Sequence, residues 1–469
     1  MAREYSRRAF LQKAIAGVAA GSVLAACQPK VVEKVVKETV EVEKVVKETV
    51  EVEKVIKETV VVQGAEPAPK EPVTIRFHAR IGEQENKLYE MQMPKFMEAN
   101  PHITLELENF PGAEYITKVT TMHAGGTLGD VCWGAIGQAI IHFFYGSNLV
   151  RPIDDLVAAE NFDLGEYYEG CIKALTLEGK LLGLPFKAHP GLAIYYYNEN
   201  LFEQAGVPIP TPEWTHDDQV TAARAIQEIA GDQPIFGVLP HTGWKGMLTL
   251  IRSFGGELIS EDGNTLLLNS DEGMAAIQRL YDFHQTWKVA PAPEQMIGDA
   301  NQMWAAGYLG MYQGGTSVSV LRNTIGDKFK WMVVNNPIGP AGVGGSDYEV
   351  DSYSVTSATK HPTEAFQWVK YLCNQDSGVL LGVIGGTVGG RPDVYGSSVL
   401  LRDPVRPVFR DIMENAQDSR VVGNWRQNEC EKAMVQLLQP LWAGQEQPTK
   451  AFVDSVTAQI QDIMNLPRP

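Results

Sequence analysis

Three tryptophans stand next to or near glycines in turn-rich parts of the chain: Trp133, Trp244 and Trp425. Loops carry a disproportionate share of the binding residues of proteins. A sugar ring has an apolar C–H face that a flat aromatic ring can cover, and its hydroxyl rim suits acidic, amide, arginine and backbone groups. The three tryptophans therefore predict carbohydrate binding, although any single aromatic residue is more often part of a core.

The sequence shows no recognisable catalytic or cofactor motif. It has no GxSxG, HExxH or P-loop pattern, and no GxGxxG follows an expected strand. The glycine-rich segments 339–345 and 385–390 come nearest to phosphate loops, but the first lacks the P-loop lysine and hydroxyl, and neither obviously opens a helix. Acidic residues are numerous enough for a glycosidase pair, but nothing marks one. We predict a binding protein rather than an enzyme, with no cofactor and no metal.

The overall composition narrows the class of protein further. A net charge of -17 argues against a nucleic-acid partner, because phosphate binding requires clustered basic side chains. A chain of 469 residues is long enough for two lobes or domains. Its cysteines form no CxxC pair and no zinc-like spacing. We interpret four of them as buried free thiols, with disulfide pairing left open: Cys132, Cys171, Cys373 and Cys430.

Residues 1–26 have the features of a signal peptide. A basic start precedes a short apolar stretch over 14–26, which cannot span a bilayer, and small residues precede Cys27. Residues 6–11 (Ser-Arg-Arg-Ala-Phe-Leu) resemble a twin-arginine export motif, and residues 24–27 (Leu-Ala-Ala-Cys) resemble a bacterial lipobox. We predict a protein outside the cytoplasm, in the periplasm or at the cell surface, held to the membrane by a lipid on Cys27.

Residues 27–71 form a separate segment that contains a decapeptide repeat. Residues 31–60 read VVEKVVKETV, EVEKVVKETV and EVEKVIKETV. A ten-residue period over three turns would be tighter than an ordinary helix, and valines weaken helix propensity. Two interpretations stay open: a helical stalk through which copies of the chain self-associate, or a flexible spacer. In both, residues 64–69 are a linker and the segment is a tether.

From residue 72 onward the pattern is that of an α/β protein. Residues 73–78 and 103–107 alternate like strands, and 88–99 and 113–124 follow them as helices. This order predicts a mixed or parallel sheet with helices on its faces. Further helices are expected at 217–230, 271–287, 362–373, 407–416 and 449–464.

Several short motifs of the body occur in the order of one known family. Residues 179–185 (GKLLGLP), 196–202 (YYNENLF) and 205–208 (AGVP) resemble elements of the extracellular solute-binding proteins of family 1, relatives of the maltose-binding protein. Residues 361–366 (HPTEAF) resemble the start of a helix in the same family. The sequence departs from the family pattern at Gly129, which replaces a proline, and at Glu213, which replaces a threonine.

The resemblance implies a two-lobed fold of the type II periplasmic-binding-protein class, with a hinged cleft between the lobes. Lobe one is expected at 72–187 plus 357–402, and lobe two at 188–356 plus 403–469. Such proteins close around their ligand by hinge motion. The implied function is to capture a mono- or oligosaccharide and deliver it to the transmembrane subunits of an ABC importer.

The resemblance also implies a set of ligand-binding positions. The three tryptophans are expected to stack on sugar, and Arg80 and Asp351 to contact hydroxyl groups. An aromatic residue often stands at the position of Thr316, so the threonine weakens the expectation of stacking there. The implied positions are Arg80, Trp133, Phe186, Trp244, Gly315, Thr316, Asp351, Tyr353 and Trp425.

Three other functions stay open on the sequence alone. The same fold could bind a charged solute such as a phosphodiester or a polyamine, with cations supplied by Arg80, Lys187 and Arg391. A surface glycosidase or lyase would need a carboxylate pair in the cleft. A structural surface protein is favoured only by the stalk.

Overall fold

The computed structural model describes residues 71–315 and 318–469, except for the side chain of Gln138. The predicted signal peptide, the acylated Cys27, the stalk and Thr316 lie outside the described residues. Pro72–Pro469 forms one compact unit. This unit starts at the residue where the α/β pattern of the sequence starts.

Lobe one is built on a five-stranded sheet with the order β2-β1-β3-β11-β6. Strands β1, β2 and β3 are parallel, and β11 runs antiparallel to both of its neighbours. The alternation of β1 buries Ile75, Phe77 and Ala79 completely. The strands are β1 (Val73–Arg80), β2 (Ile103–Phe110), β3 (Val131–Ala135), β6 (Leu184–His189) and β11 (Glu349–Val355), with a small hairpin of β4 (Thr176–Leu177) and β5 (Lys180–Leu181) beside them.

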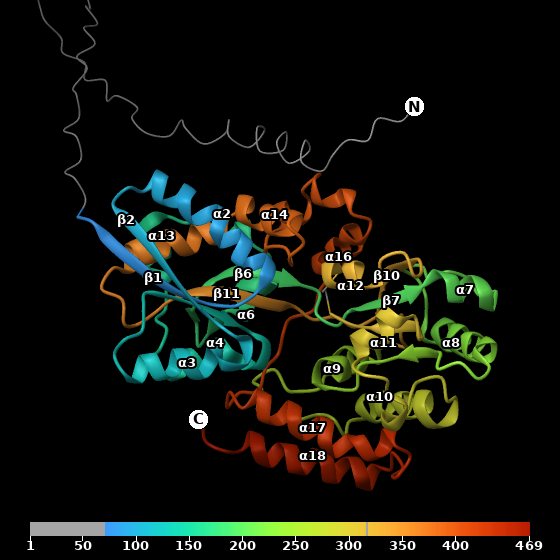
Figure 1. Ribbon diagram of the computed structural model, residues 1–469. Coiled ribbons are helices and arrows are strands. Elements are labelled where there is room, and N and C mark those ends of the chain that lie inside the picture. The colour runs from blue at the N-terminus through green and yellow to red at the C-terminus, as the bar shows by residue number, and fades with distance from the viewer. Residues whose placement is uncertain (1–70, 316–317) are drawn as a thin grey trace, which may run out of the picture. The chain divides into compact units, whose positions relative to one another are not determined.

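Helices cover both faces of this sheet. Figure 1 shows α2 (Glu83–Ala99), α13 (Pro362–Leu372) and α14 (Gln375–Val383) on one side, and α3 (Gly112–Ala124) and α4 (Ile140–Gly146) on the other. Phe77 of β1 meets Trp368 of α13 edge to face, with ring centroids 5.3 Å apart. The remaining elements of this lobe are η1 (Gly137–Ala139), α5 (Asp154–Glu160), η2 (Leu164–Glu166), α6 (Glu169–Ala174), α15 (Pro392–Tyr395) and η5 (Leu400–Arg402).

Lobe two is built on a four-stranded sheet with the order β10-β7-β9-β8. Strand β8 is parallel to β9, and β7 is antiparallel to both β9 and β10. The carboxyl ends of β8, β9 and β10 therefore meet at one edge, the usual place for a ligand in an open α/β sheet. The strands are β7 (Ile194–Asn198), β8 (Phe236–Leu239), β9 (Leu309–Gln313) and β10 (Trp331–Asn335).

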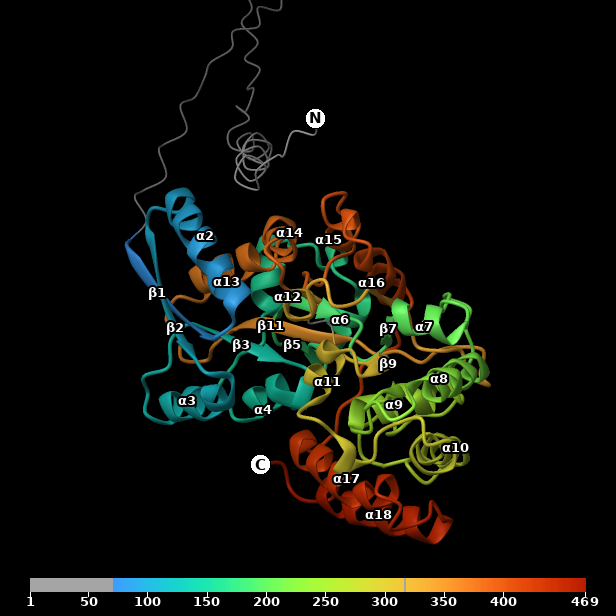
Figure 2. The same cartoon turned by 45° about the vertical axis from the view of Figure 1, so that its right-hand side comes forward.

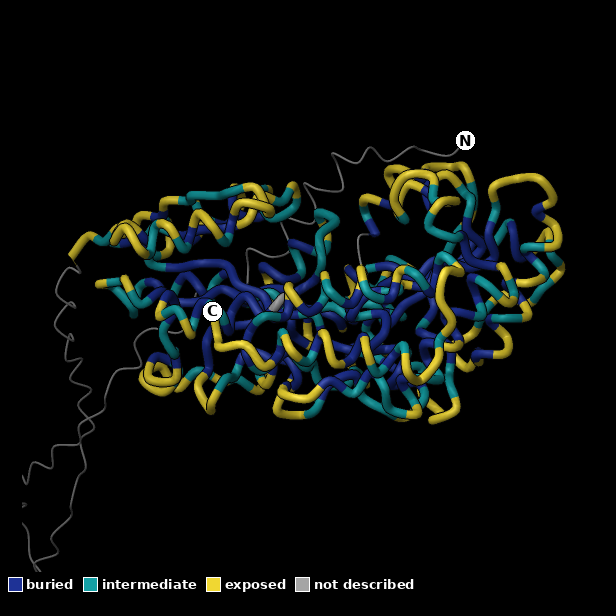
Figure 3. Tube along the Cα trace, turned by 90° about the horizontal axis from the view of Figure 1, so that it is seen from below, coloured by how far each residue is buried: buried dark blue, intermediate teal, exposed yellow. Residues whose placement is uncertain are grey.

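The helices of lobe two include a layer formed from the end of the chain. Figures 1 and 2 both place α17 (Gln427–Trp442) and α18 (Lys450–Met464) beside each other below α9 (Trp244–Ser253) and α10 (Asp271–Tyr281). Figure 3 shows the buried residues gathered in the interior and the exposed ones mainly on the outer turns of the trace. The other helices are α7 (Glu199–Ala205), α8 (His216–Ala230), η3 (Asp282–Thr286), η4 (Pro293–Gln295), α11 (Ala300–Ala306), α12 (Val318–Ile325) and α16 (Val405–Glu414).

The expected strands and helices are confirmed with small shifts. The helices predicted at 217–230, 362–373, 407–416 and 449–464 are α8, α13, α16 and α18, to within two residues at either end. The predicted helix 88–99 starts earlier, at Glu83, and 271–287 consists of α10 followed by a π-helical turn. Helix α8 begins at a capping box, in which Asp218 N–H donates to Thr215 Oγ1 and Thr215 N–H donates to Asp218 Oδ2.

One predicted lobe boundary is wrong. The resemblance places residues 349–356 in lobe two, but β11 (Glu349–Val355) is a strand of the lobe one sheet, between β3 and β6. Its Tyr353 packs among aromatic residues of lobe one, with Phe186 5.0 Å away between ring centroids. The second crossing between the sheets therefore runs over residues 336–348, before β11, and the first runs from His189 to Ala193.

Candidate ligand-binding site

Strand β1 brings three of the predicted site residues together at its carboxyl end. Arg80 is the last residue of β1, and its guanidinium carbon lies 4.5 Å from the centroid of the Trp133 ring in β3. The same guanidinium lies 4.0 Å from Asp351 Oδ2 in β11. The Arg80 side chain remains 43 % exposed, so it is free to contact a ligand.

Lys187 forms the centre of a compensated charge cluster beside Arg80. Its Nζ donates to Glu85 Oε1 at 2.6 Å and lies 2.8 Å from Asp351 Oδ2. We call Glu85, Lys187 and Asp351 the Lys187 cluster. Burial disfavours all three charges, but their mutual attraction outweighs it: the pKa of Lys187 is raised, and the pKa values of Glu85 and Asp351 are lowered.

A second ion cluster joins lobe two to the strand that returns to lobe one. Lys245, in the first turn of α9, donates to Asp347 Oδ2 at 2.6 Å and lies 3.3 Å from Glu349 Oε1. Asp347 also accepts from Ser419 Oγ at 2.8 Å. Burial raises the pKa of Glu349, with Asp347 and Asp351 adding to the effect, although Lys245 opposes it. Lys245 therefore connects α9 with the second crossing and with β11.

Gln313, at the carboxyl end of β9, ties together the loops at the edge of lobe two. Its Oε1 accepts from His241 N–H at 3.0 Å, and its Nε2 donates to Leu192 O in the first crossing at 2.9 Å. Asn336, just after β10, also donates to Leu192 O, at 3.1 Å. Gly315, a predicted site residue, accepts a hydrogen bond from Tyr196 Oη at 2.7 Å through its carbonyl.

Helix α17 adds residues to this region that the sequence did not reveal. Gln427, Glu431 and Val435 are spaced four residues apart and share one helix face. Val435 is 50 % exposed and borders Gly243 at the start of α9, and α17 also contacts η1 of lobe one. Gln427 Nε2 donates to Glu431 Oε1 at 3.0 Å, and burial raises the pKa of Glu431. The four-residue spacing of Gln427, Glu431 and Val435 is the sequence pattern that could have indicated this shared helix face.

The sequence of this chain matches a known protein family. Residues 81–378, more than half of the chain, match the family model of the bacterial extracellular solute-binding proteins. The chain belongs to this family. The matched family is one of binding proteins, and the chain has its two-lobed α/β fold.

Relatives and solved structures agree with the family match. A binding protein of Brucella abortus is 24 % identical over 379 residues, covering 78 % of this chain and 88 % of the relative. The arabinooligosaccharide-binding protein of Halalkalibacterium halodurans is 27 % identical over 149 residues, 32 % of each chain. An ABC substrate-binding protein of Listeria monocytogenes, solved in complex with cycloalternan, has the same fold with a TM-score of 0.72 at 18 % identity, covering 84 % of this chain and all of that one.

The three tryptophans predicted to stack on sugar are all largely buried in this solute-binding protein. Trp133 is 5 % exposed, with Arg80 over its ring and Tyr115 at its edge, 5.3 Å away between centroids. Trp425 is 9 % exposed and packs against Gly146, with the Arg468 guanidinium 4.1 Å from its ring centroid. Trp244 is 2 % exposed and belongs to the lobe two core. Core packing accounts for Trp244, and stacking on sugar stays a prediction for Trp133 and Trp425.

Phe186 and Tyr353 are packed inside lobe one of the solute-binding protein. Tyr353 is fully buried, and its hydroxyl shares a 2.5 Å hydrogen bond with the hydroxyl of Tyr89 in α2. Phe186 is 2 % exposed and stacks near the Tyr89 ring. Both residues hold the sheet against α2, directly behind the Lys187 cluster. Their role as ligand contacts stays a prediction.

Other groups considered in the sequence have structural partners. Arg391 donates to Glu166 Oε2 at 2.6 Å and to both carboxylate oxygens of Asp393 at 2.9 and 2.7 Å. Within residues 71–315 and 318–469 there is no group of three His, Cys, Asp or Glu side chains that could hold a metal, and no helix long and apolar enough to cross a membrane. Four cysteines are buried and free, as predicted: Cys132, Cys171, Cys373 and Cys430.

Proposed function

We propose that this protein is the extracytoplasmic substrate-binding subunit of an ABC importer, and that it captures a mono- or oligosaccharide between its two lobes by hinge closure. The ligand is held at the strand ends that carry Arg80 and Trp133 in lobe one and Gln313 and His241 in lobe two. The transmembrane subunits of the importer then receive the sugar. The protein itself performs no reaction and uses no cofactor.

The main observation in favour of a neutral ligand is that most of the charged side chains at the candidate site are already paired within the protein. A charged solute requires side chains whose charge is not already satisfied. Lys187 has two carboxylate partners, and Arg391 is held by Glu166 and Asp393. Arg80 is the one exposed cation of the three that the sequence suggested, and it lies over Trp133. One arginine beside an aromatic ring suits the hydroxyl rim and apolar face of a sugar.

The relatives support the same ligand class. One curated relative is named for arabinooligosaccharide, and one structural neighbour was solved with cycloalternan. Other neighbours were solved with α-D-tagatose, maltose and maltotriose. We extend this class of ligand, but no individual sugar, to the present chain.

We further propose that the protein is exported by its twin-arginine signal and anchored by acylated Cys27, with the decapeptide repeats as a tether. The motifs at residues 6–11 and 24–27 support this location, as does the extracellular character of the matched family. If the repeats are helical, they provide a surface for self-association of the chains.

A thermal-shift screen tests the ligand class. A panel of mono- and oligosaccharides is compared with a panel of phosphodiesters and polyamines, because a ligand that binds only the native state raises the melting temperature. At least one neutral sugar should raise it in a saturable manner, and calorimetric titration should then give one site per chain. Stabilisation by charged solutes alone would refute the proposal.

A further inference from the structure

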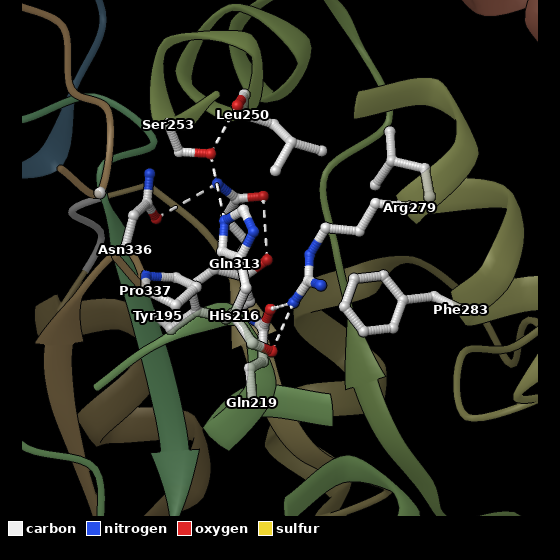
Figure 4. Close-up of a pocket in the computed structure, with 12 residues that line it drawn as sticks. Tyr195, His216, Gln219, Leu250, Ser253, Arg279, Phe283, Gln313, Asn336 and Pro337 are labelled. Atoms are coloured by element: carbon white, nitrogen blue, oxygen red, sulfur yellow. Dashed lines mark hydrogen bonds between the residues drawn. The ribbon is translucent and has the colours of Figure 1, made fainter. Parts of the chain in front are cut away.

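Lobe two contains a small cavity, lined by both polar and apolar side chains, behind the candidate ligand site. It lies between α8, α9, α10 and the ends of β9 and β10, and it has a volume of about 20 Å³. This is room for one water-sized species. Figure 4 shows the side chains around it, with the guanidinium of Arg279 directed at Gln219 and His216. The polar residues of the lining are Tyr195, His216, Gln219, Ser253, Arg279, Gln313 and Asn336.

Arg279 is a buried cation that lacks an ion-pair partner among the described residues. It is 9 % exposed, and no described carboxylate lies within 4.0 Å of its guanidinium, although Asp217 and Asp282 act on it from farther away. Its Nη2 donates to His216 O at 2.8 Å and to Gln219 Oε1 at 2.9 Å, which are both neutral acceptors. The guanidinium carbon also lies 4.8 Å from the Phe283 ring centroid. Buried charges in proteins are normally paired, because an unpaired one loses its hydration without compensation.

The cavity lining has an excess of hydrogen-bond donors. Arg279 Nε and Gln219 Nε2 are the two buried side-chain atoms of the described lining that have no hydrogen-bond partner, and both are donors. The two amide oxygens of the lining nearest the strand ends are occupied: Gln313 Oε1 accepts from His241 N–H and from Tyr195 Oη at 3.4 Å, and Asn336 Oδ1 accepts from Gln313 Nε2 at 3.3 Å. A water molecule would bring two more donor protons, whereas an anion brings only acceptor capacity.

We propose that this cavity binds a single halide-sized anion, held by Arg279 Nε–H and Gln219 Nε2–H. The anion supplies the missing counter-charge of Arg279. The proposal does not depend on the sugar function, since none of its ligands is a candidate sugar contact. It does have a link to that site: the lining residue Gln313 also fixes His241 and the first crossing, so the bound anion stabilises the scaffold of lobe two.

The test measures the thermal unfolding of the full chain in a chloride titration, with gluconate replacing chloride at constant ionic strength and pH. Chloride should raise the melting temperature saturably, by about 1–2 °C for each tenfold gain in the folding equilibrium constant that binding provides. Bromide should do the same, and a bromide-soaked crystal should show an anomalous peak within hydrogen-bond distance of Arg279 Nε. Equal melting temperatures in chloride and gluconate, or a water without anomalous signal in the cavity, would overturn the proposal.

Two variants and one control sharpen the test. Gln219→Glu places a carboxylate beside Arg279 and should abolish the chloride dependence while the protein stays folded. Arg279→Met should abolish it as well, but at a cost in stability. Arg224→Met changes an exposed arginine of the same helix α8 and should keep the chloride dependence of the wild type. Chloride dependence that persists in Gln219→Glu would place the anion elsewhere and refute the assignment.

Discussion

Lys187→Met should destabilise the protein by leaving two buried carboxylates without their shared cation. The side chains of Lys187, Glu85 and Asp351 are 8 %, 18 % and 17 % exposed, so solvent screens them little. Removing one partner of a buried ion pair costs about 3–5 kcal/mol of unfolding free energy. Arg80 lies 4.0 Å from Asp351 and retains part of the compensation, so we expect the lower end, about 3 kcal/mol.

The stability difference between the wild type and Lys187→Met should change with pH in a definite direction. In the wild type the pKa values of Glu85 and Asp351 are lowered by folding, so their contribution to stability is present above their unfolded-state pKa values and is lost as pH falls through the folded ones. In Lys187→Met, burial and mutual repulsion should raise both folded-state pKa values, so this contribution changes sign. The stability difference between wild type and variant should therefore be largest near neutral pH and shrink toward pH 4.

Urea unfolding of both proteins between pH 7 and pH 4 measures this difference. Lys180→Met, a change at an exposed lysine of β5, is the matched control and should alter stability by less than about 0.5 kcal/mol. The triple variant Glu85→Gln, Lys187→Met, Asp351→Asn should recover most of the loss, because no charge is left unpaired. A loss in Lys187→Met that is independent of pH would show that the cost comes from packing, and the electrostatic argument would fail.

Three further predictions concern the tryptophans, the anchor and the tether. Trp133→Ala should weaken binding of the best sugar by about 1–3 kcal/mol in calorimetric titration. Trp244→Ala should instead lower the unfolding free energy by about 3–5 kcal/mol, because its ring lies in the lobe two core. A Trp244→Ala protein that keeps its normal melting temperature but has lost its affinity would contradict the packing explanation. Cys27→Ala should move the protein from the membrane fraction to the soluble fraction, and a variant that stays in the membrane without its lipid would disprove the anchor. A chain starting at Glu71 should fold and bind sugar like the full chain, since Pro72–Pro469 is a compact unit of its own; a large loss of affinity would contradict the tether interpretation.

Local sequence patterns predicted most of the helices and strands, but they did not predict which strands pair with each other. The alternation in β1 and the capping box before α8 each depend on a few neighbouring residues, so both can be predicted from the local sequence. The sheet to which β11 belongs depends on its partners β3 and β6, which are more than 150 residues away in the chain, so its local sequence does not reveal it. Its assignment to lobe two was therefore wrong.

The candidate site was predictable at its strand ends and less so in its helices. Arg80, Trp133 and Asp351, three of the positions that the resemblance implied, lie beside one another, and their contact with a ligand stays a prediction. Trp244 was interpreted as a loop residue because Gly243 precedes it, but it is the first residue of α9 and faces the core. The partners of Lys187, by contrast, come from α2 and β11, and only the tertiary structure shows that its charge is already satisfied.

The two ion clusters restrict how this protein can change its ligand during evolution. A single substitution at Lys187 or Lys245 leaves two carboxylates without their shared cation, and one at Asp351 or Asp347 removes one of the two carboxylate partners of a buried lysine. Either change harms folding before it can alter recognition. Such positions can change only in compensating pairs. Exposed positions such as His241 and Val435 have no such constraint and can vary one at a time. New sugar preferences should therefore arise first at these exposed positions, while the charged framework stays the same among descendants.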